Sequence, residues 1–508
     1  MFKKRKRISP VMTFIILIIV TILLSGFLHL LKFQSEYTTV SATGSLLNNV
    51  VEVKNLFSTS GIKYIVTHAV KNFMSFTPMS ILIIVLIGIG VLEKSGFLKS
   101  FFTLLTKNSK KNTITFILIF ICLLLSLLGD IGFAFMLPIG ALLFKYGRRN
   151  PFGGIIASFA ALSFGSGINI FLTANDSSLL KLTLSAAKTI DPNYTIGVFF
   201  SLFIMITMLI ATSFVFTFVT EKKIMPKLPK YEYEEDEVVI TNKELRGIIV
   251  GLGLGALYTL LIIYMIIPGL PLSGVLLDHR ATIYIDMLFG ANSLFNQGFI
   301  FIITLLFAII GFGYGFMCKT IRSAKDVTES LAYSLDTIGN IMVLLFFTSL
   351  FISVFEESHI GEVVTAFIAT TIGKITFTGV GLIILVIILV AISNIFYPNS
   401  LAKWKIMSTS MVPLFMNASI SPEFAQILYV SSSTITTGIT PLFPFFVIYL
   451  AFLEKYNKED IVTMKDGIGY MMHYAAYTAI IMFIVIIGFY MIGIPTGIGA
   501  FPGVSYGA

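Results

Sequence analysis

The sequence of 508 residues is poor in cysteine, histidine, tryptophan and charge. It has two cysteines, one tryptophan and five histidines, and 12% of its residues are charged. Cys122 and Cys318 lie in or next to apolar segments, which excludes a disulfide framework and a cysteine-based zinc site. The histidines are scattered without HExxH spacing, and no GxxxxGK[ST] loop is present. We therefore expect no enzyme, no cofactor and no ATP site.

The formal net charge is +9, and the Lys and Arg residues gather in short clusters between apolar runs. In a membrane protein such clusters mark cytoplasmic loops, so we predict no nucleic-acid partner. The cluster at 3–7 precedes the apolar run 11–33, which is too long for the core of a signal peptide. We interpret 1–33 as an uncleaved first transmembrane helix in the cell (plasma) membrane, with the N-terminus cytoplasmic.

Hydrophobic residues make up 56% of the sequence, which predicts an all-α polytopic membrane protein without a separate soluble domain. A span needs about 20 apolar residues. Uninterrupted spans are expected at 11–33, 77–92, 195–220, 247–268, 299–317, 340–355 and 471–492. The connecting regions are expected to be an extracytoplasmic loop with an interfacial helix (34–76), a cytoplasmic linker (221–246), a linking helix with an outer loop (247–297) and an extracytoplasmic tail (493–508).

The apolar segment 112–147 is bounded by basic clusters near 107–111 and 145–149, with Gly129 and Asp130 at its centre. It is too short for two spans, and a single span would place strong positive charge on both membrane faces. A re-entrant helical hairpin that enters from the cytoplasm, with its tip at Gly129 and Asp130, satisfies both constraints.

Two apolar stretches, 151–184 and 422–453, each begin with proline and are interrupted by small polar residues. The interruptions read SFGSGIN at 163–169 and SSSTITTGIT at 431–440. Non-helical backbone survives in hydrocarbon only where it lines a wet cavity or is buried in protein. Such broken helices are the best sequence indication of a transporter's binding site.

A shift of 271 residues aligns Pro151 with Pro422 and Gly167 with Gly438. The order of parts also recurs, with a second hairpin at 376–416 that should open to the outside. We therefore predict two repeats of inverted topology, 77–220 and 298–492. The expected fold is nine transmembrane helices plus two re-entrant helical hairpins, with the C-terminus extracytoplasmic.

Hydroxyl and amide oxygens beside the two interruptions suit a hard cation such as Na⁺. Alternatively, these Ser and Thr residues satisfy helix backbone or allow close packing. Asp130 and Asp176 are expensive in a membrane and are candidates for a proton or cation, although Asp176 could also lie in water at the outer boundary. The candidates for ion coupling are Asp130, Ser163, Ser166, Gly167, Asn169, Thr434, Thr437, Gly438 and Thr440.

Trp404, the only tryptophan, follows the predicted tip of the second hairpin at 394–400. It either stacks on a planar substrate or lies in an interfacial aromatic belt. Lys403 and Lys405 flank it and either attract an anion or extend toward the interface.

Several segments resemble the p-aminobenzoyl-glutamate transporter (AbgT) family, over nearly the whole chain and in order. They read NLFSTSGIKYIVTHAVKNFMSF, GVLEKSGF, GDIGFAFMLPIGALLFKYGRRNPFGGI, NSLAKWKIMSTSMVPLF and SPEFAQILYVSSSTITTGITPLFPFF. The resemblance implies a homodimer with nine spans and two hairpins per protomer. It also implies uptake of p-aminobenzoyl-glutamate and proton-coupled export of sulfonamide antimetabolites.

By the same resemblance, Asp176, Asn394, Trp404 and Pro422 match substrate-site positions, and we add Ser400 at the hairpin tip. Three positions depart from the family pattern. Leu401 replaces a serine, Val430 an arginine and Ser433 an aspartate. An arginine would bind a carboxylate with two hydrogen bonds, so its loss bears on the substrate.

The sequence therefore predicts an ion-coupled secondary transporter of p-aminobenzoyl-glutamate or a related small aromatic or amide carboxylate, coupled to H⁺ or Na⁺. Within the transport class, the alternative is a Na⁺-coupled carboxylate or peptide importer. A channel or an intramembrane enzyme is the alternative of another class. We expect a small-molecule substrate and the lipid bilayer as the other partners.

Overall fold

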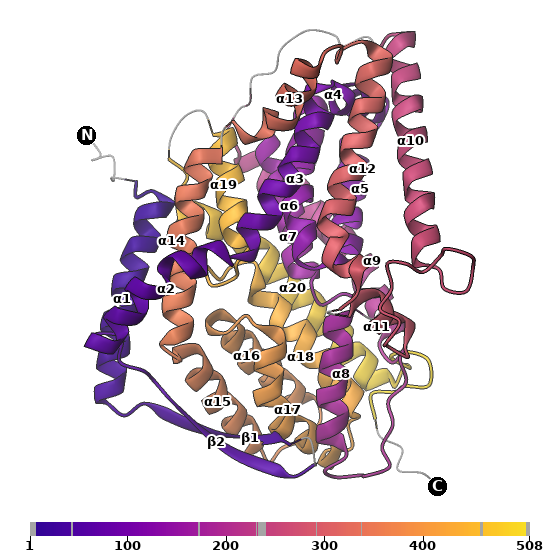
Figure 1. Ribbon diagram of the computed structural model, residues 1–508. Helices are drawn as coiled ribbons and strands as arrows, with labels where there is room; N and C mark the ends of the chain where they lie inside the picture. Colours follow the sequence, from indigo (N-terminus) through magenta and orange to yellow (C-terminus); the bar gives the residue numbers. More distant parts are fainter. Residues whose placement is uncertain are drawn as a thin grey trace.

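The computed structural model describes residues 7–41, 44–170, 173–229, 231, 240–290, 292–336, 338–457 and 461–503, which form one bundle composed mainly of helices (Figure 1). Residues 232–239 of the predicted linker and 504–508 of the predicted tail lie outside this range. The elements up to the linker are α1 (Pro10–Leu30), β1 (Gln34–Val40), β2 (Leu46–Glu52), α2 (Thr59–Met74), α3 (Thr77–Lys94), α4 (Phe97–Thr106), α5 (Lys111–Leu125), η1 (Ser126–Leu128), α6 (Asp130–Tyr146), α7 (Pro151–Gly165), α8 (Ala174–Ala187), α9 (Leu202–Val219) and a π-helical turn (Thr220–Ile224). The elements after it are α10 (Asn242–Ile266), α11 (Tyr284–Phe289), α12 (Leu294–Cys318), α13 (Ala324–Ala332), α14 (Ile338–Glu357), α15 (Ile360–Gly373), α16 (Val380–Phe396), α17 (Ser400–Asn417), α18 (Pro422–Thr437), α19 (Phe446–Tyr456) and α20 (Met464–Ile492).

A β-hairpin corrects the all-α prediction. β1 and β2 pair antiparallel, with Gln34 opposite Glu52 and Val40 opposite Leu46. The β-branched residues in both strands favour this pairing, but their spacing also fits the irregular loop that we expected. The Thr370 and Thr409 hydroxyls donate to carbonyls of β1, at 2.8 and 2.6 Å, and so attach the hairpin to α15 and α17.

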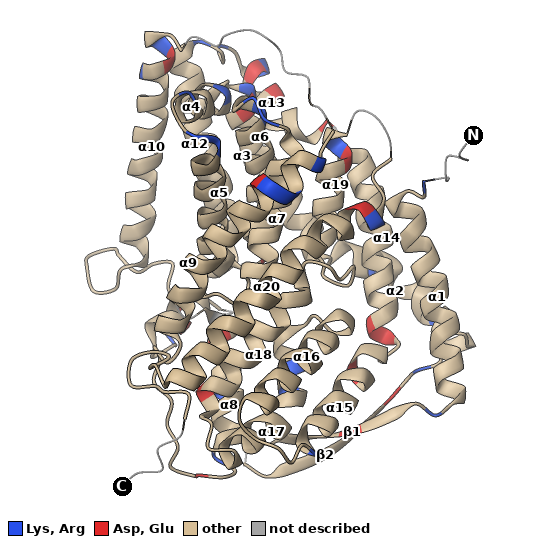
Figure 2. Ribbon diagram, turned by 180° about the vertical axis from the view of Figure 1, so that it is seen from behind, with Lys and Arg blue, Asp and Glu red and all other residues tan. Residues whose placement is uncertain are grey.

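Eight helical stretches within the described residues are long and apolar enough to cross a membrane. Seven overlap the uninterrupted spans expected from the sequence, and the eighth, Lys111–Leu128, belongs to the predicted first hairpin. The count of nine spans stays a prediction, because it includes the two broken helices and leaves this hairpin out. Lys and Arg gather at the end of the bundle that carries α4 and α13 (Figure 2).

The order of elements in the first half recurs in the second. A long helix and a shorter one (α3 and α4, α14 and α15) precede a helical pair (α5 and α6, α16 and α17). An interrupted helix (α7 and α8, α18 and α19) and a long helix (α9, α20) follow. The pair α5 and α6 lies in the upper half of the bundle, and α16 and α17 lie in the lower half (Figure 1).

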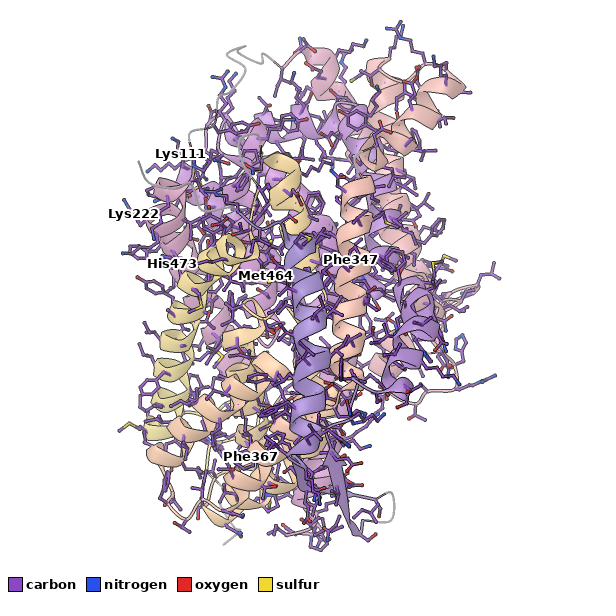
Figure 3. All side chains as sticks on the ribbon, turned by 90° about the vertical axis from the view of Figure 1, so that its left-hand side faces the viewer. Lys111, Lys222, Phe347, Phe367, Met464 and His473 are labelled. Carbon is purple, nitrogen blue, oxygen red and sulfur yellow. The ribbon has the colours of Figure 1, made fainter. Side chains whose placement is uncertain are left out.

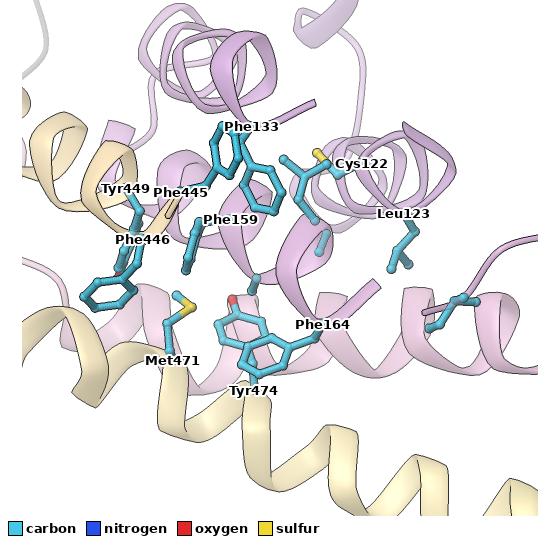
Figure 4. Close-up of a cluster of buried hydrophobic side chains, with 14 of the residues drawn as sticks. Cys122, Leu123, Phe133, Phe159, Phe164, Phe445, Phe446, Tyr449, Met471 and Tyr474 are labelled. Atoms are coloured by element: carbon cyan, nitrogen blue, oxygen red, sulfur yellow. The ribbon is translucent and has the colours of Figure 1, made fainter. Parts of the chain in front are cut away.

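The two halves pack on each other reciprocally. α6 contacts α19 of the second half, and α17 contacts α8 of the first half. At the first of these contacts the Phe133 ring stacks on Phe445 at 5.1 Å, and nearby Phe159 of α7 stacks on Tyr449 at 4.4 Å (Figure 4). Offset stacking at these separations adds to the burial of apolar surface.

One buried ion pair fixes the ends of the first helical pair. Arg149 follows α6, and its guanidinium lies 2.6 Å from Glu221 in the π-helical turn after α9. The same guanidinium donates to the Thr115 hydroxyl of α5 at 2.7 Å. Lys111 at the start of α5 and Lys222 in the turn lie at this same end of the molecule (Figure 3). The connection holds both limbs of the pair to the end of α9.

Glycines allow α6 and α7 to touch backbone to backbone. A methyl group added at Gly154 would lie 2.0 Å from the carbonyl oxygen of Gly140, and one added at Gly140 would lie 2.2 Å from the Ser158 hydroxyl. Small residues permit such close approach of helices in membranes. The limb α6 is therefore held directly against the helix that is interrupted after Gly165.

We expect Gly154→Ala to destabilise the protein by about 1–3 kcal/mol, because the new methyl group meets backbone that cannot move independently. The measurement is the unfolding temperature of purified protein in detergent. Gly253→Ala is the matched control, since a methyl group on that helical glycine of α10 meets nothing within 4 Å. Equal unfolding temperatures for the two variants would contradict the α6–α7 contact.

Candidate functional site

The two interrupted helices meet beside their interruptions. A methyl group added at Gly167 would lie 2.7 Å from the side chains of Thr434 and Val430 on α18. One added at Gly438 would lie 2.7 Å from the Ser163 hydroxyl on α7. Gly167 aligns with Gly438 in the repeat and Ser163 with Thr434, so the two contacts exchange equivalent positions. This reciprocity is what an approximate two-fold relation between the halves would produce.

The interruptions begin later than the sequence predicted. Ser163 is still part of α7, and residues 431–437 are still part of α18, so the non-helical stretches start at 166 and 438. The hydroxyls in these helical turns bond to carbonyls one turn back, as Ser163 does to Phe159 at 2.7 Å and Thr437 does to Ser433 at 3.1 Å. These hydroxyl groups therefore donate to helix backbone, which is the alternative role considered in the sequence analysis.

A small cavity lies between the first interruption, α9 and α18. Its volume is about 30 Å³, and its polar lining includes Asn169, Asp176 and Gln426, with Gly167 and Val430 beside them. That space is enough for a water molecule or a small cation. The Asn169 Oδ1 atom is buried without a hydrogen-bond partner in the described part of the chain. The cavity therefore contains an acceptor that a cation or a water molecule would satisfy.

Asp176 also stabilises the start of α8. Its carboxylate accepts from the Thr173 backbone N–H at 3.0 Å, from the Thr173 hydroxyl at 2.7 Å and from the Asn169 amide at 2.9 Å. In return the Asp176 N–H donates to the Thr173 hydroxyl, which completes a capping box. The negative charge lies at the helix N-terminus, where the helix dipole favours it.

A second polar cluster lies where α16, α17 and α18 meet. The Lys403 side chain is 0% exposed, and its ammonium donates to the Asn394 amide oxygen at 2.5 Å. The Asn394 amide nitrogen donates to the hydroxyls of Thr436 and Thr437, both at 3.2 Å. Thr436 in turn donates to the carbonyl of Ala391 at 2.8 Å. These bonds join the tip of the second helical pair to the end of α18.

Trp404 connects the two clusters. Its indole N–H donates to the Thr183 hydroxyl of α8 at 3.0 Å, and Thr183 lies 2.6 Å from the Gln426 amide oxygen. Gln426 lines the small cavity. The indole is fully buried and stacks on Tyr429 at 4.3 Å, so it lies in the interior and not in an interfacial belt.

Not all predicted residues come together. Asp130 lies apart, at a cavity of about 280 Å³ that also contains Glu356 and Tyr64. Pro422 is the first residue of α18, at the end opposite Gly438. The neighbouring Ser421 donates to the carbonyl of Phe501 at 2.7 Å. Ser166 is exposed and donates to the carbonyl of Ser163 at 2.9 Å.

The remaining predicted residues take part in side-chain-to-backbone hydrogen bonds near the two clusters. Ser400 accepts, through its carbonyl, the Tyr429 hydroxyl at 2.5 Å. Thr434 donates to the carbonyl of Ser431, and Thr440 donates to the carbonyl of Ile395 in α16. Hydroxyl lone pairs remain available on these side chains, so their role as ion ligands stays a prediction.

Sequence reasoning missed Thr183, Gln426 and Tyr429. Each lies in a helix with apolar neighbours and none belongs to a recognisable motif. The positions of Thr183 and Gln426 became apparent only from contacts between residues more than 200 positions apart, and that of Tyr429 from contacts with α17. For Gln426 alone there was a signal, because an amide in an apolar helix must find a buried partner.

Two interrupted helices that cross inside a bundle of apolar helices, with a cavity and polar clusters beside them, define a membrane transporter. A profile of the AbgT transporter family matches residues 6–504, and the chain therefore belongs to that family. It is 25% identical over 499 residues to the p-aminobenzoyl-glutamate transport protein of Escherichia coli (strain K12), covering 98% of this chain and 94% of that protein.

Two solved structures are similar over nearly the whole chain. The YdaH transporter of Alcanivorax borkumensis is 25% identical, with a TM-score of 0.48, and the match covers 96% of this chain and 100% of that one. MtrF of Neisseria gonorrhoeae, described with a class of antimetabolite efflux pumps, is 28% identical, with a TM-score of 0.49 and 98% of both chains covered.

The single tryptophan makes the connection between the clusters measurable. We expect Thr183→Val to change the emission of Trp404 and to lower the unfolding temperature. The substitution keeps the shape but leaves the indole N–H and the Gln426 oxygen unpaired, at a cost of about 1–3 kcal/mol. Thr207→Val is the control, because its hydroxyl is exposed and bonds only within α9. Emission and stability equal to those of the control would contradict the Trp404–Thr183 bond.

Proposed function

We propose that the protein is an ion-coupled secondary transporter of p-aminobenzoyl-glutamate or a related small aromatic or amide carboxylate. The observation that carries this proposal is the reciprocal meeting of the two interrupted helices at Gly167 and Gly438. It gathers polar groups in the interior of an apolar bundle, where alternating access requires a binding site. The name of the Escherichia coli relative supports the substrate class.

The coupling ion would bind in the small cavity beside Asp176. The cavity offers a carboxylate, an amide oxygen without a partner in the described part of the chain, and space for one small ion. These features suit either H⁺ on Asp176 or Na⁺ between the oxygens. A Na⁺-coupled carboxylate or peptide importer is therefore the second candidate. Dependence of uptake on a Na⁺ gradient would favour it over a proton-coupled transporter.

We propose that the end of the bundle rich in Lys and Arg faces the cytoplasm, because positive charge favours that side of the plasma membrane (Figure 2). The two helical pairs would then enter the bilayer as re-entrant hairpins from opposite sides, in an inverted repeat. The family resemblance supports a homodimer. Single-cysteine labelling from each side of the membrane tests the orientation.

We expect Asp176→Asn to abolish ion-driven accumulation of p-aminobenzoyl-glutamate in proteoliposomes, because it removes the only carboxylate that lines the small cavity among the described residues. Uptake is measured under an imposed pH gradient and, separately, under a Na⁺ gradient. Transport of sulfonamides is measured in the opposite direction, as export.

The control for this experiment is Asp326→Asn. Asp326 forms the same type of capping box with Ser323 at the start of α13, away from the cavity. Both variants weaken a helix cap, but only one changes the cavity. If Asp176→Asn accumulates substrate as well as Asp326→Asn does, Asp176 has no part in coupling. Flux that fails to saturate with concentration would instead indicate a channel.

A further inference from the structure

Lys403 is a buried basic residue that has no carboxylate partner in the described part of the chain. Its side chain is completely enclosed, yet no described carboxylate forms an ion pair with it. Transfer of an uncompensated ammonium from water into a protein interior costs several kcal/mol. Lysine is among the residues that are almost never fully buried without a partner.

The carboxylates on the helices packed against α17 are engaged elsewhere. Glu423 of α18 accepts the Tyr194 hydroxyl at 2.8 Å. Asp176 of α8 closes its own capping box, and Glu362 of α15 lies 3.2 Å from His359. The ammonium is left with the Asn394 amide oxygen and, at 5.3 Å, the ring of Tyr429.

The helix ends around Lys403 compensate its charge only in part. It lies in the first turn of α17, where the helix dipole adds to its positive potential. The C-terminal ends of α16 and α18, near Asn394 and Thr437, contribute partial negative charge. An ammonium has three donors, and one of them donates to the Asn394 amide oxygen at 2.5 Å. The site therefore has spare donors as well as spare charge.

We propose that Lys403 is the anchor for a carboxylate group of the transported molecule, with the Asn394 amide and the hydroxyls of Thr436 and Thr437 completing the site. The inference rests on the proposed function and names the residue that binds the anionic end of the substrate. A carboxylate would supply the missing counter-charge and would accept several hydrogen bonds from these donors at once.

The site is closed in this structure by hydrogen bonds between α18 and the helices α16 and α17. Asn394 bonds to Thr436 and Thr437, Thr436 and Thr440 donate to the carbonyls of Ala391 and Ile395, and the Tyr429 hydroxyl bonds to the carbonyl of Ser400. Separation of α16 and α17 from α18 breaks these bonds and opens the ammonium to a ligand. The aromatic pair of Trp404 and Tyr429 lies directly beside it, as a ligand with an aromatic ring and a carboxylate would require.

The test compares the full-length wild type with Lys403→Met, Lys403→Gln and Lys403→Arg, and with Lys405→Met as the control. Lys405 is the neighbouring lysine, but its side chain is exposed. Binding is followed by thermal unfolding and by Trp404 emission. The probes are p-aminobenzoyl-glutamate, p-aminobenzoate, glutamate and the uncharged diamide of p-aminobenzoyl-glutamate, with sodium chloride and sodium phosphate at the same ionic strength.

We expect p-aminobenzoyl-glutamate to stabilise the wild type and Lys405→Met, and the diamide and inorganic salts to have no comparable effect. In Lys403→Met and Lys403→Gln the Kd should rise about 10- to 100-fold, as for the loss of a hydrogen bond to a charged group. Without ligand, Lys403→Met should unfold at a higher temperature than the wild type, because the substitution removes an uncompensated buried charge. A lysine with only a structural role would give the opposite shift.

Five outcomes would overturn the inference. If Lys403→Met binds p-aminobenzoyl-glutamate with wild-type affinity, Lys403 is not part of the site. If the wild type responds equally to the diamide, no carboxylate is bound there. Both results leave the transporter proposal intact. An equal response to chloride or phosphate assigns an inorganic anion instead. Failure of both neutral variants to fold, while Lys403→Arg folds, makes the charge structural. If no probe binds the wild type, the proposed substrate class is wrong and the anchor with it.

Discussion

The structure depends on satisfying the backbone where two helices stop inside an apolar bundle. In hydrocarbon each unpaired peptide group costs several kcal/mol. Each helical pair bonds to the interruption next to it. Ser126, at the tip of the first pair, donates to the carbonyl of Gly165 at 3.0 Å. In the second half, the Thr440 hydroxyl donates to the carbonyl of Ile395 in α16, and the Asn394 amide donates to the Thr436 hydroxyl. These bonds attach each pair to its interruption.

This arrangement explains why polar groups accumulate in the interior without a described metal cluster. Most hydroxyls of the serine- and threonine-rich stretch bond to carbonyls, and their density follows from the number of backbone groups near the end of α18. Asp176 lies at the first interruption, and Lys403 reaches the end of α18 through Asn394. Trp404, Thr183 and Gln426 connect the two. An acidic residue beside one interruption and a basic residue beside the other give the two halves different chemistry on a similar order of elements.

The membrane class, the transport function and the family could be predicted from the sequence. Composition and the length of apolar runs can be read directly from it, and the family segments extend over nearly the whole chain. Pro151 and Pro422 indicated helix starts for the same reason, since proline fits the first turn of a helix. The partners of Trp404 and the burial of Lys403 could not be predicted, since they depend on contacts across more than 200 residues or between helices. The β-hairpin escaped because its stability comes from α15 and α17, far along the chain.

That hairpin has a consequence for biosynthesis. β1 is made near the start of translation, but Thr370 and Thr409, which bond to it, follow 334 and 371 residues after their partners. At about 5–20 residues per second, the strand waits roughly 20 to 70 s for its support. The hairpin is therefore synthesised long before α15 and α17, and these two bonds attach it only after both helices have been made.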